Sequence, residues 1–146
     1  MRFIGDYSAK TDVKGRVFLP AALRKALCAE GENKLVLRKD VFQKCLVLYP
    51  ESVWNNRLDD LKSHLNLWKR EHQEILRKFS ADAELIELDS NGRLLIAKQK
   101  LQYAEIAADV RFLGVDDTIE IWSKENLDRH LNEDSNLGGD IENLFD

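Results

Sequence analysis

The chain has few of the residues and patterns that mark exported, metal-binding or membrane proteins. Its 146 residues include only two cysteines, Cys28 and Cys45, which do not form a CxxC spacing and so offer no zinc-binding motif. No apolar run approaches the roughly 20 residues of a membrane-spanning helix, and the segment after Met1 lacks a secretory apolar core. We therefore expect a cytoplasmic protein with reduced thiols, no bound metal and no membrane partner.

Catalytic motifs are missing as well. None of the three histidines lies near a cysteine or serine in a recognisable nucleophile context, and the sequence has no HExxH, Walker lysine loop or GxGxxG. The acid pairs Asp59-Asp60 and Asp116-Asp117 stand in helix and turn patterns, where solvation explains them. We expect a protein that is not an enzyme and that uses no cofactor.

Charge is plentiful but unevenly distributed along the chain. Residues 1–50 hold ten Lys/Arg against five Asp/Glu, a charge of +5, whereas residues 81–132 hold six against eleven, a charge of −5. Residues 133–146 hold five acids and no base, so the net charge of −4 would be +1 without this tail. An anionic partner is therefore compatible with the chain, and we expect it on the first half.

The strongest pattern is a short motif that occurs twice. Asp12-Val-Lys-Gly-Arg16 and Asp89-Ser-Asn-Gly-Arg93 place Asp, Gly and Arg at identical spacing, 77 residues apart. Each copy predicts a polar turn, followed by a short apolar strand and then a helix. A repeat of this kind indicates an internal duplication, which constrains the fold more than a single motif does.

The duplication divides the chain into four parts and predicts an α+β class. We expect a first repeat over 1–52, a helical connector over 53–80, a second repeat over 81–132 and an acidic, flexible tail over 133–146. Strands are predicted at 3–10, 17–19, 34–38, 45–49, 83–88, 94–96, 110–115 and 118–122, and helices at 20–28, 97–104 and 123–131.

The connector has the clearest helical periodicity in the chain. Its stripe consists of Trp54, Leu58, Leu61, Leu65, Trp68, Ile75 and Phe79, with His72 in the one remaining place. The steps alternate between four and three residues, which is typical of one face of a helix. The pattern favours two amphipathic helices with a break near Ser63–Asn66, and a free coiled coil is the alternative.

The basic side chains of the motifs suggest contact with a nucleic acid. Arginine suits phosphates and guanine edges, because its guanidinium group is planar and always charged. We expect Asp12 to hold the first turn and to orient Arg16, and the neighbouring Lys14 favours a nucleic-acid contact there. Asp89 would act in the same way on Arg93. The alternative is an ion pair that only stabilises each turn, which the acidic second half favours for Arg93.

With its two Asp-x-x-Gly-Arg copies, each followed by an apolar strand and a short helix, the chain resembles the MraZ family over residues 1 to about 132. The segments Phe3–Lys10 and Lys44–Pro50 are part of the resemblance. This family is a two-repeat relative of AbrB/SpoVT-type transcription factors. The resemblance implies a duplicated AbrB/SpoVT-like repeat that forms a pseudo-symmetric swapped-hairpin, double-psi-like β-barrel with flanking helices, assembled into ring-shaped homo-oligomers.

The resemblance also implies a function on double-stranded DNA. Members of the family bind short direct repeats in the promoter of their own operon, the bacterial division and cell-wall gene cluster, usually as repressors, which would place the chain on the nucleoid. The family's DNA-contacting positions fall on Lys14 and Arg16, with Asp12 as the motif acid. The second motif supplies Asp89 and Arg93.

The second motif departs from the first in two places. Ala97 stands where the first repeat has Pro20, and Asn91 stands where it has Lys14. Together with the charge of −5 in that half, these changes predict a weaker DNA contact by the second motif. Two other functions fit the same fold: an AbrB-like antitoxin-type regulator with unrelated targets, and a ring scaffold that binds protein through the connector and does not touch DNA.

Overall fold

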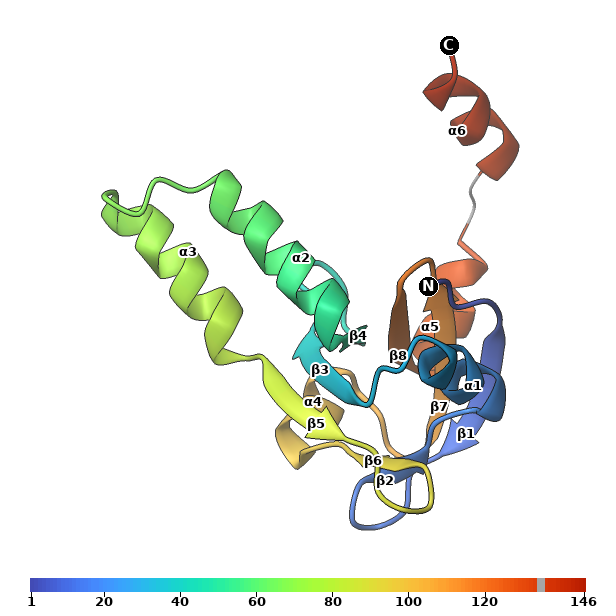
Figure 1. The fold of residues 1–146 in the computed structure, drawn as a ribbon. Helices are drawn as coiled ribbons and strands as arrows, with labels where there is room; N and C mark the ends of the chain where they lie inside the picture. Colours follow the sequence, from blue (N-terminus) through green and yellow to red (C-terminus); the bar gives the residue numbers. More distant parts are fainter. Residues whose placement is uncertain (134–135) are drawn as a thin grey trace.

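The strands and helices follow one another in two similar series. The computed structural model describes residues 1–133 and 136–146 (Figure 1). The first series is β1 (Asp6–Lys10), β2 (Arg16–Phe18), α1 (Ala21–Ala29), β3 (Lys34–Lys39) and β4 (Leu46–Pro50). The second series is β5 (Glu84–Glu87), β6 (Arg93–Leu95), α4 (Lys98–Tyr103), β7 (Asp109–Val115) and β8 (Thr118–Ser123). The same order of elements therefore occurs twice, as the doubled motif predicts.

The short helix of each series begins from the same backbone conformation. Pro20 precedes α1 with φ −51° and ψ 138°, and Ala97 precedes α4 with φ −60° and ψ 146°. Proline is suited to this position because its ring fixes φ near −65°. Ala97 adopts the same conformation without that restraint, so this departure from the first repeat leaves the path of the chain unchanged.

The two series build one sheet by exchanging strands. β1 pairs with β7, β3 pairs with β5, and β4 pairs with β8, and all three pairings are antiparallel. With the hairpins β3–β4 and β7–β8 they form a six-stranded sheet in the order β1-β7-β8-β4-β3-β5. β2 and β6 form a separate two-stranded ribbon. Each half lacks strand partners without the other, so the two halves must fold together.

One hydrophobic core joins the ribbon to the sheet. Val17 and Leu94, the middle residues of the ribbon strands, are 1% and 0% exposed and share a cluster with Leu37 and Phe112 of the sheet. Burial of each such side chain stabilises the fold by about 1.5–3 kcal/mol. Because strand side chains alternate in direction, the residues on either side of this middle pair must point away from the core.

The structure does not show the closed β-barrel that the resemblance implies. In the described residues, β2 and β6 pair only with each other, and the larger sheet ends at β1 and β5. Each ribbon strand has three residues and follows a tight turn that satisfies its own backbone groups, which leaves little chain for a second ladder. The interleaving of the two halves and the flanking helices are present, and the class is α+β as predicted.

The connector forms two helices with the predicted break between them. They are α2 (Glu51–Ser63) and α3 (Arg70–Ala81). The chain folds back at the break, so that Trp54 in α2 stacks on Phe79 in α3 with ring centroids 5.1 Å apart. His72 Nδ1, at the start of α3, accepts a hydrogen bond from the backbone N–H of Asn66 in the loop at 2.8 Å. The two helices extend from the sheet as an arm (Figure 1), and they do not form a free coiled coil.

Two further helices lie near the end of the chain. They are α5 (Lys124–Leu131) and α6 (Leu137–Leu144). The α6 helix falls within the segment for which the sequence predicts a flexible tail, and residues 134–135 of that segment lie outside the described residues. In the part of the chain that the structure describes, no helix has the length and apolar character needed to cross a membrane.

Candidate nucleic-acid interface

The first motif forms a tight turn that its own aspartate closes. Asp12 Oδ1 accepts hydrogen bonds from the backbone N–H groups of Lys14 and Arg16, both at 2.9 Å. Asp12 Oδ2 accepts a third hydrogen bond from Arg16 Nε at 2.7 Å. Gly15 has a φ of +86°, and a Cβ there would lie 2.5 Å from the Ile96 carbonyl oxygen, so this position requires glycine. One carboxylate therefore holds both the turn and the arginine side chain.

The second motif repeats this geometry. Asp89 Oδ1 accepts hydrogen bonds from the backbone N–H groups of Asn91 and Arg93, both at 2.9 Å, and Asp89 Oδ2 accepts one from Arg93 Nε at 2.9 Å. Gly92 has a φ of +82°. The two turns therefore agree in every hydrogen bond made by the aspartate.

Both aspartates are held in the ionised form. The pKa of Asp12 is lowered, chiefly because the backbone N–H of Arg16 donates a hydrogen bond to its carboxylate. The pKa of Asp89 is lowered for the same reason by the backbone N–H of Arg93. Each carboxylate occupies the Nε–H of its arginine, and among the described residues the Nη groups of both arginines have no hydrogen-bond partner. These groups remain available to an acceptor outside the chain.

The ribbon brings the two motifs onto one surface. Arg16 on β2 lies opposite Leu95 on β6, and Phe18 lies opposite Arg93. The middle pair of the ribbon faces the core, so these four residues face outward together; we call them the ribbon face. Phe18 and Leu95 are 56% and 58% exposed. The loops that precede β2 and β6 both project at the lower edge of the molecule in Figure 1, although they lie 77 residues apart in sequence.

The surroundings of the two turns are unequal. Lys14 is exposed and forms no ion pair within the described residues, whereas the second turn has the neutral Asn91 at the same position. A Cβ on Gly15 would lie 3.5 Å from Leu101 of α4, whereas a Cβ on Gly92 would lie 2.8 Å from Arg24 Nη1 of α1. The guanidinium carbon of Arg93 also lies 5.7 Å from the centre of the Phe18 ring. The first turn therefore carries its extra positive charge on its own exposed Lys14, whereas the second turn has the Arg24 guanidinium lying against it.

The chemistry of the ribbon face suits a polyanion whose bases present hydrogen-bonding edges. Arginine Nη groups that have no partner within the described chain can form paired hydrogen bonds with phosphates or with guanine O6 and N7. Lys14 adds a point charge beside Arg16, and the exposed Phe18 and Leu95 offer apolar contacts. This combination of charge, fixed geometry and apolar surface makes the ribbon face and its two loops the candidate nucleic-acid interface.

All five site residues predicted from the sequence lie on or beside the ribbon. The structure brings Asp12 and Arg16 together in one turn and Asp89 and Arg93 together in the other. Reasoning from the sequence missed Phe18 and Leu95, which share the outward face with both arginines. Their alternation with the buried residues of each short strand was the signal that could have found them.

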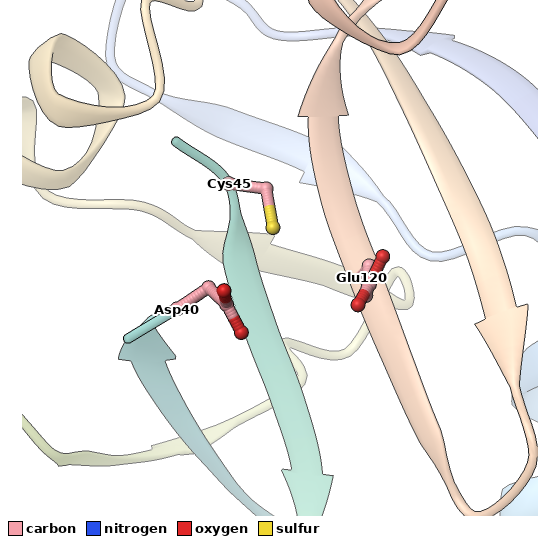
Figure 2. A group of neighbouring side chains, drawn as sticks. All are labelled: Asp40, Cys45 and Glu120. Carbon is pink, nitrogen blue, oxygen red and sulfur yellow. The ribbon is translucent and has the colours of Figure 1, made fainter. Parts of the chain in front are cut away.

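A second cluster of polar groups lies where β3 connects to β4. Asp40, Cys45 and Glu120 each place one ligand-type atom within 4.8 Å of the other two (Figure 2). Asp40 accepts hydrogen bonds from two backbone N–H groups of its own loop, and Glu120 accepts one from Trp122 Nε1 at 2.9 Å. Burial raises the pKa of the Cys45 thiol, and the two carboxylates raise it further, whereas a metal binds the thiolate. Local hydrogen bonding and packing therefore explain this cluster.

Comparison with known proteins gives consistent matches along the chain. The model of the MraZ protein family, described as antitoxin-like, matches residues 2–78 and again residues 79–140. A protein of Phocaeicola vulgatus named transcriptional regulator MraZ is 54% identical over 145 residues, which cover 99% of this chain and 94% of that protein. A protein of the same name from Bacteroides fragilis is 51% identical over 99% of this chain and 92% of its own length. The name of these relatives is that of a regulator and not of an enzyme.

Proposed function

Because this chain belongs to the MraZ family, we propose that it is a transcriptional regulator that binds double-stranded DNA in a sequence-specific way. Its targets are short direct repeats in the promoter of its own operon, the bacterial division and cell-wall gene cluster, and its action there is repression. The observation that carries this proposal is the ribbon face, on which Arg16 and Arg93 point away from the core and are each fixed by an aspartate.

The dimensions of DNA support this use of the ribbon. The major groove of B-DNA is about 12 Å wide and admits a two-stranded β-ribbon. In the groove, the Nη groups of Arg16 would meet guanine O6 and N7, while Lys14 at the loop would meet a phosphate. Asp12 and Asp89 act indirectly, because each holds its arginine in position and so reduces the entropy lost on binding.

Self-association is the second part of the proposal. A single ribbon supplies few phosphate contacts, so one subunit binds weakly and loses affinity as salt rises. A ring homo-oligomer presents several ribbons, and direct repeats spaced to match neighbouring subunits increase affinity without new kinds of contact. The arm supports this view, because Trp68 in the loop between its helices and Ile75 on α3 are 96% and 47% exposed and offer apolar surface to a neighbouring subunit.

Each part of the chain then has a role. The repeats over 1–52 and 81–132 together form the unit that reads DNA, and the connector over 53–80 forms the arm that contacts a neighbour. The acidic segment over 133–146, which contains the α6 helix, takes no part in the DNA contact. A ring bound to the promoter covers the site that RNA polymerase needs, so the protein acts in the cytoplasm on the nucleoid.

Two alternatives use the same fold. A ring scaffold would bind a protein through the exposed side chains of the arm, such as Trp68, and would not need the ribbon face. An antitoxin-type regulator would bind DNA beside the gene of a partner toxin, and the family's antitoxin-like description favours this variant. The first alternative predicts no affinity for DNA, and the second predicts affinity for a different promoter.

Binding to the DNA upstream of the protein's own gene tests the proposal. A fluorescently labelled duplex from that region is titrated with the full chain over a series of salt concentrations, beside an unrelated duplex of equal length. We expect the upstream duplex to bind more tightly, with log affinity falling linearly as log salt rises. The Arg129→Ala variant, which removes an exposed charge on α5, away from both the ribbon and the arm, should bind as the wild type does. Equal or absent binding of both duplexes would rule out the proposed function.

A further inference from the structure

The ribbon face has nearly equal ends, so its backbone alone would fit DNA in two opposite directions. Half a turn about its centre exchanges Arg16 with Arg93, and each arginine Nε lies close to its aspartate, at 2.7 Å from Asp12 and 2.9 Å from Asp89. A DNA-binding ribbon with equal ends matches a palindromic site, because the symmetry of an operator follows that of the protein. Whether the ribbon has a direction therefore depends on the side chains around the two arginines.

The side chains beside Arg16 differ from those at the equivalent positions beside Arg93. The first end of the ribbon consists of Lys14, Arg16 and Leu95, and the second end consists of Asn91, Arg93 and Phe18. The first end carries two cations and an aliphatic side chain. The second end carries one cation on the ribbon, an amide and an aromatic ring, and Arg24 of α1 lies beside its turn with Nη1 bonded to the Leu19 carbonyl oxygen. No exchange of the two strands superposes these sets.

The two ends suit different base pairs. The Arg16 side chain is 36% exposed and has Lys14 beside it, which suits guanine and the neighbouring phosphates. Arg93 is 24% exposed and lies 5.7 Å from the Phe18 ring centre, so it is the more restrained arginine. Beside it, the Asn91 amide can pair with adenine N6 and N7, and Phe18 can contact a thymine methyl group.

We propose that the unequal ends make the ribbon a directional reader of DNA, with the first end on guanine and the second end on a step that contains an A·T pair. The proposal rests on the proposed function, since it concerns how the same surface reads its site. It also accounts for direct repeats. Neighbours in a ring are related by rotation about the ring axis, so their ribbons point the same way along DNA that follows the rim, and same-direction copies of a site are required.

The chain contains a natural position from which to observe this direction. Cys28 on α1 is exposed and lines the same pocket as Asn91, whereas Cys45 is buried. An iron chelate attached through a thiol at Cys28 therefore lies beside the second end of the ribbon and cuts the DNA nearest to it. The probe is a duplex with one copy of the promoter repeat between two unrelated flanks of equal length, bound by the full chain.

Three proteins are compared by this cleavage. We expect the labelled wild type to cut one flank in about tenfold excess over the other, which is the discrimination that one amide–adenine pair provides. The exchange variant Lys14→Asn/Phe18→Leu/Asn91→Lys/Leu95→Phe should cut the opposite flank. The variant Phe18→Leu/Asn91→Lys has two equal ends and should cut both flanks equally.

The outcomes separate this proposal from the function on which it rests. Equal cutting of both flanks by the wild type, or cutting of the same flank by the wild type and the exchange variant, overturns the directional reading while DNA binding stands. Failure of the unlabelled wild type to bind the upstream duplex removes the proposed function itself. The altered side chains Lys14, Phe18, Asn91 and Leu95 are all exposed, so thermal unfolding should match that of the wild type. The two-residue variant still tests the proposal if the four-residue one is unstable.

Discussion

The two Asp-x-x-Gly-Arg turns share an internal structure but have different surroundings. The hydrogen bonds to Asp12 are 2.9, 2.9 and 2.7 Å long, and those to Asp89 are all 2.9 Å. The exposed side chains of the turns differ, since the first turn carries Lys14 and the second carries Asn91 at the same position. The comparison shows that Asp, Gly and Arg define the turn, and that the remaining positions are free to set its charge.

A second difference lies beneath the turns. The first turn is supported by backbone and apolar groups, because a Cβ on Gly15 would meet the Ile96 carbonyl oxygen first and the Leu101 side chain next. The second turn is supported by the Arg24 side chain, whose Nη1 donates a hydrogen bond to the Leu19 carbonyl oxygen at 3.0 Å. A flexible side chain yields more easily than a backbone carbonyl, so the first turn should tolerate change less well than the second.

Loss of each arginine should give the largest contrast between the turns. We expect Arg16→Ala to weaken promoter binding about 100-fold or more, because the lost contact is repeated in every subunit of a ring. Arg93→Ala should weaken it about tenfold, since that side chain is less exposed and has no lysine beside it. Fluorescence anisotropy measures both affinities.

Light scattering after gel filtration is the control for the arginine variants. Both variants should keep the mass of the wild-type oligomer, because neither arginine lies on the arm. Equal losses of affinity in the two variants would show that the charge around the turns does not decide which arginine contributes more to promoter binding.

Substitution of glycine should distinguish a tight turn from an open one. Gly15→Ala should lower the free energy of unfolding by about 2–4 kcal/mol, since the positive φ and the contact with the Ile96 oxygen both oppose a side chain. Gly31→Ala is the matched control, because Gly31 has a φ of +72° but no atom within 4 Å of the added Cβ, and should lose only about 1 kcal/mol. Urea unfolding measures both values, and a similar loss for the two would contradict the close packing under the first turn.

Adding a lysine to the second turn should make the two ends more alike. We expect Asn91→Lys to steepen the fall of log affinity with log salt by roughly 0.9 per ribbon, since one more phosphate contact forms. Affinity at low salt should rise several-fold. Asn132→Lys adds the same charge at the end of α5, away from the ribbon and the arm, and should leave the slope unchanged. An equal change in both variants would indicate a general charge effect.

The smallest expected effect is the dependence of stability on pH. The pKa of Asp12 and that of Asp89 are lowered in the folded chain, so their contribution is fully present above the unfolded pKa, near 4, and is lost as pH falls through the folded value. We expect Asp12→Asn to reduce stability at pH 7 and to flatten the decline below about pH 4. Urea unfolding at both pH values measures this. Asp59→Asn, at an exposed position on α2, should keep the wild-type profile.

Much of the fold could be predicted because it depends on short stretches of sequence. The doubled motif predicted two similar series of strands and helices, and the stripe from Trp54 to Phe79 predicted a pair of helices with a break. The closed barrel did not follow, because closure depends on ladders between distant strands that the three-residue β2 and β6 do not form. The α6 helix was missed because its segment is polar and contains Gly138-Gly139, which disfavour a helix.

The candidate site also has one part that depends on short stretches of sequence and one part that depends on contacts between distant residues. The sequence alone determined each turn, because the hydrogen bonds that Asp12 and Asp89 accept come from no further than four residues along the chain. Only the tertiary structure decided that the two turns share one face. That arrangement arises because Val17 and Leu94, distant in sequence, are buried together in a core that neither half can complete alone.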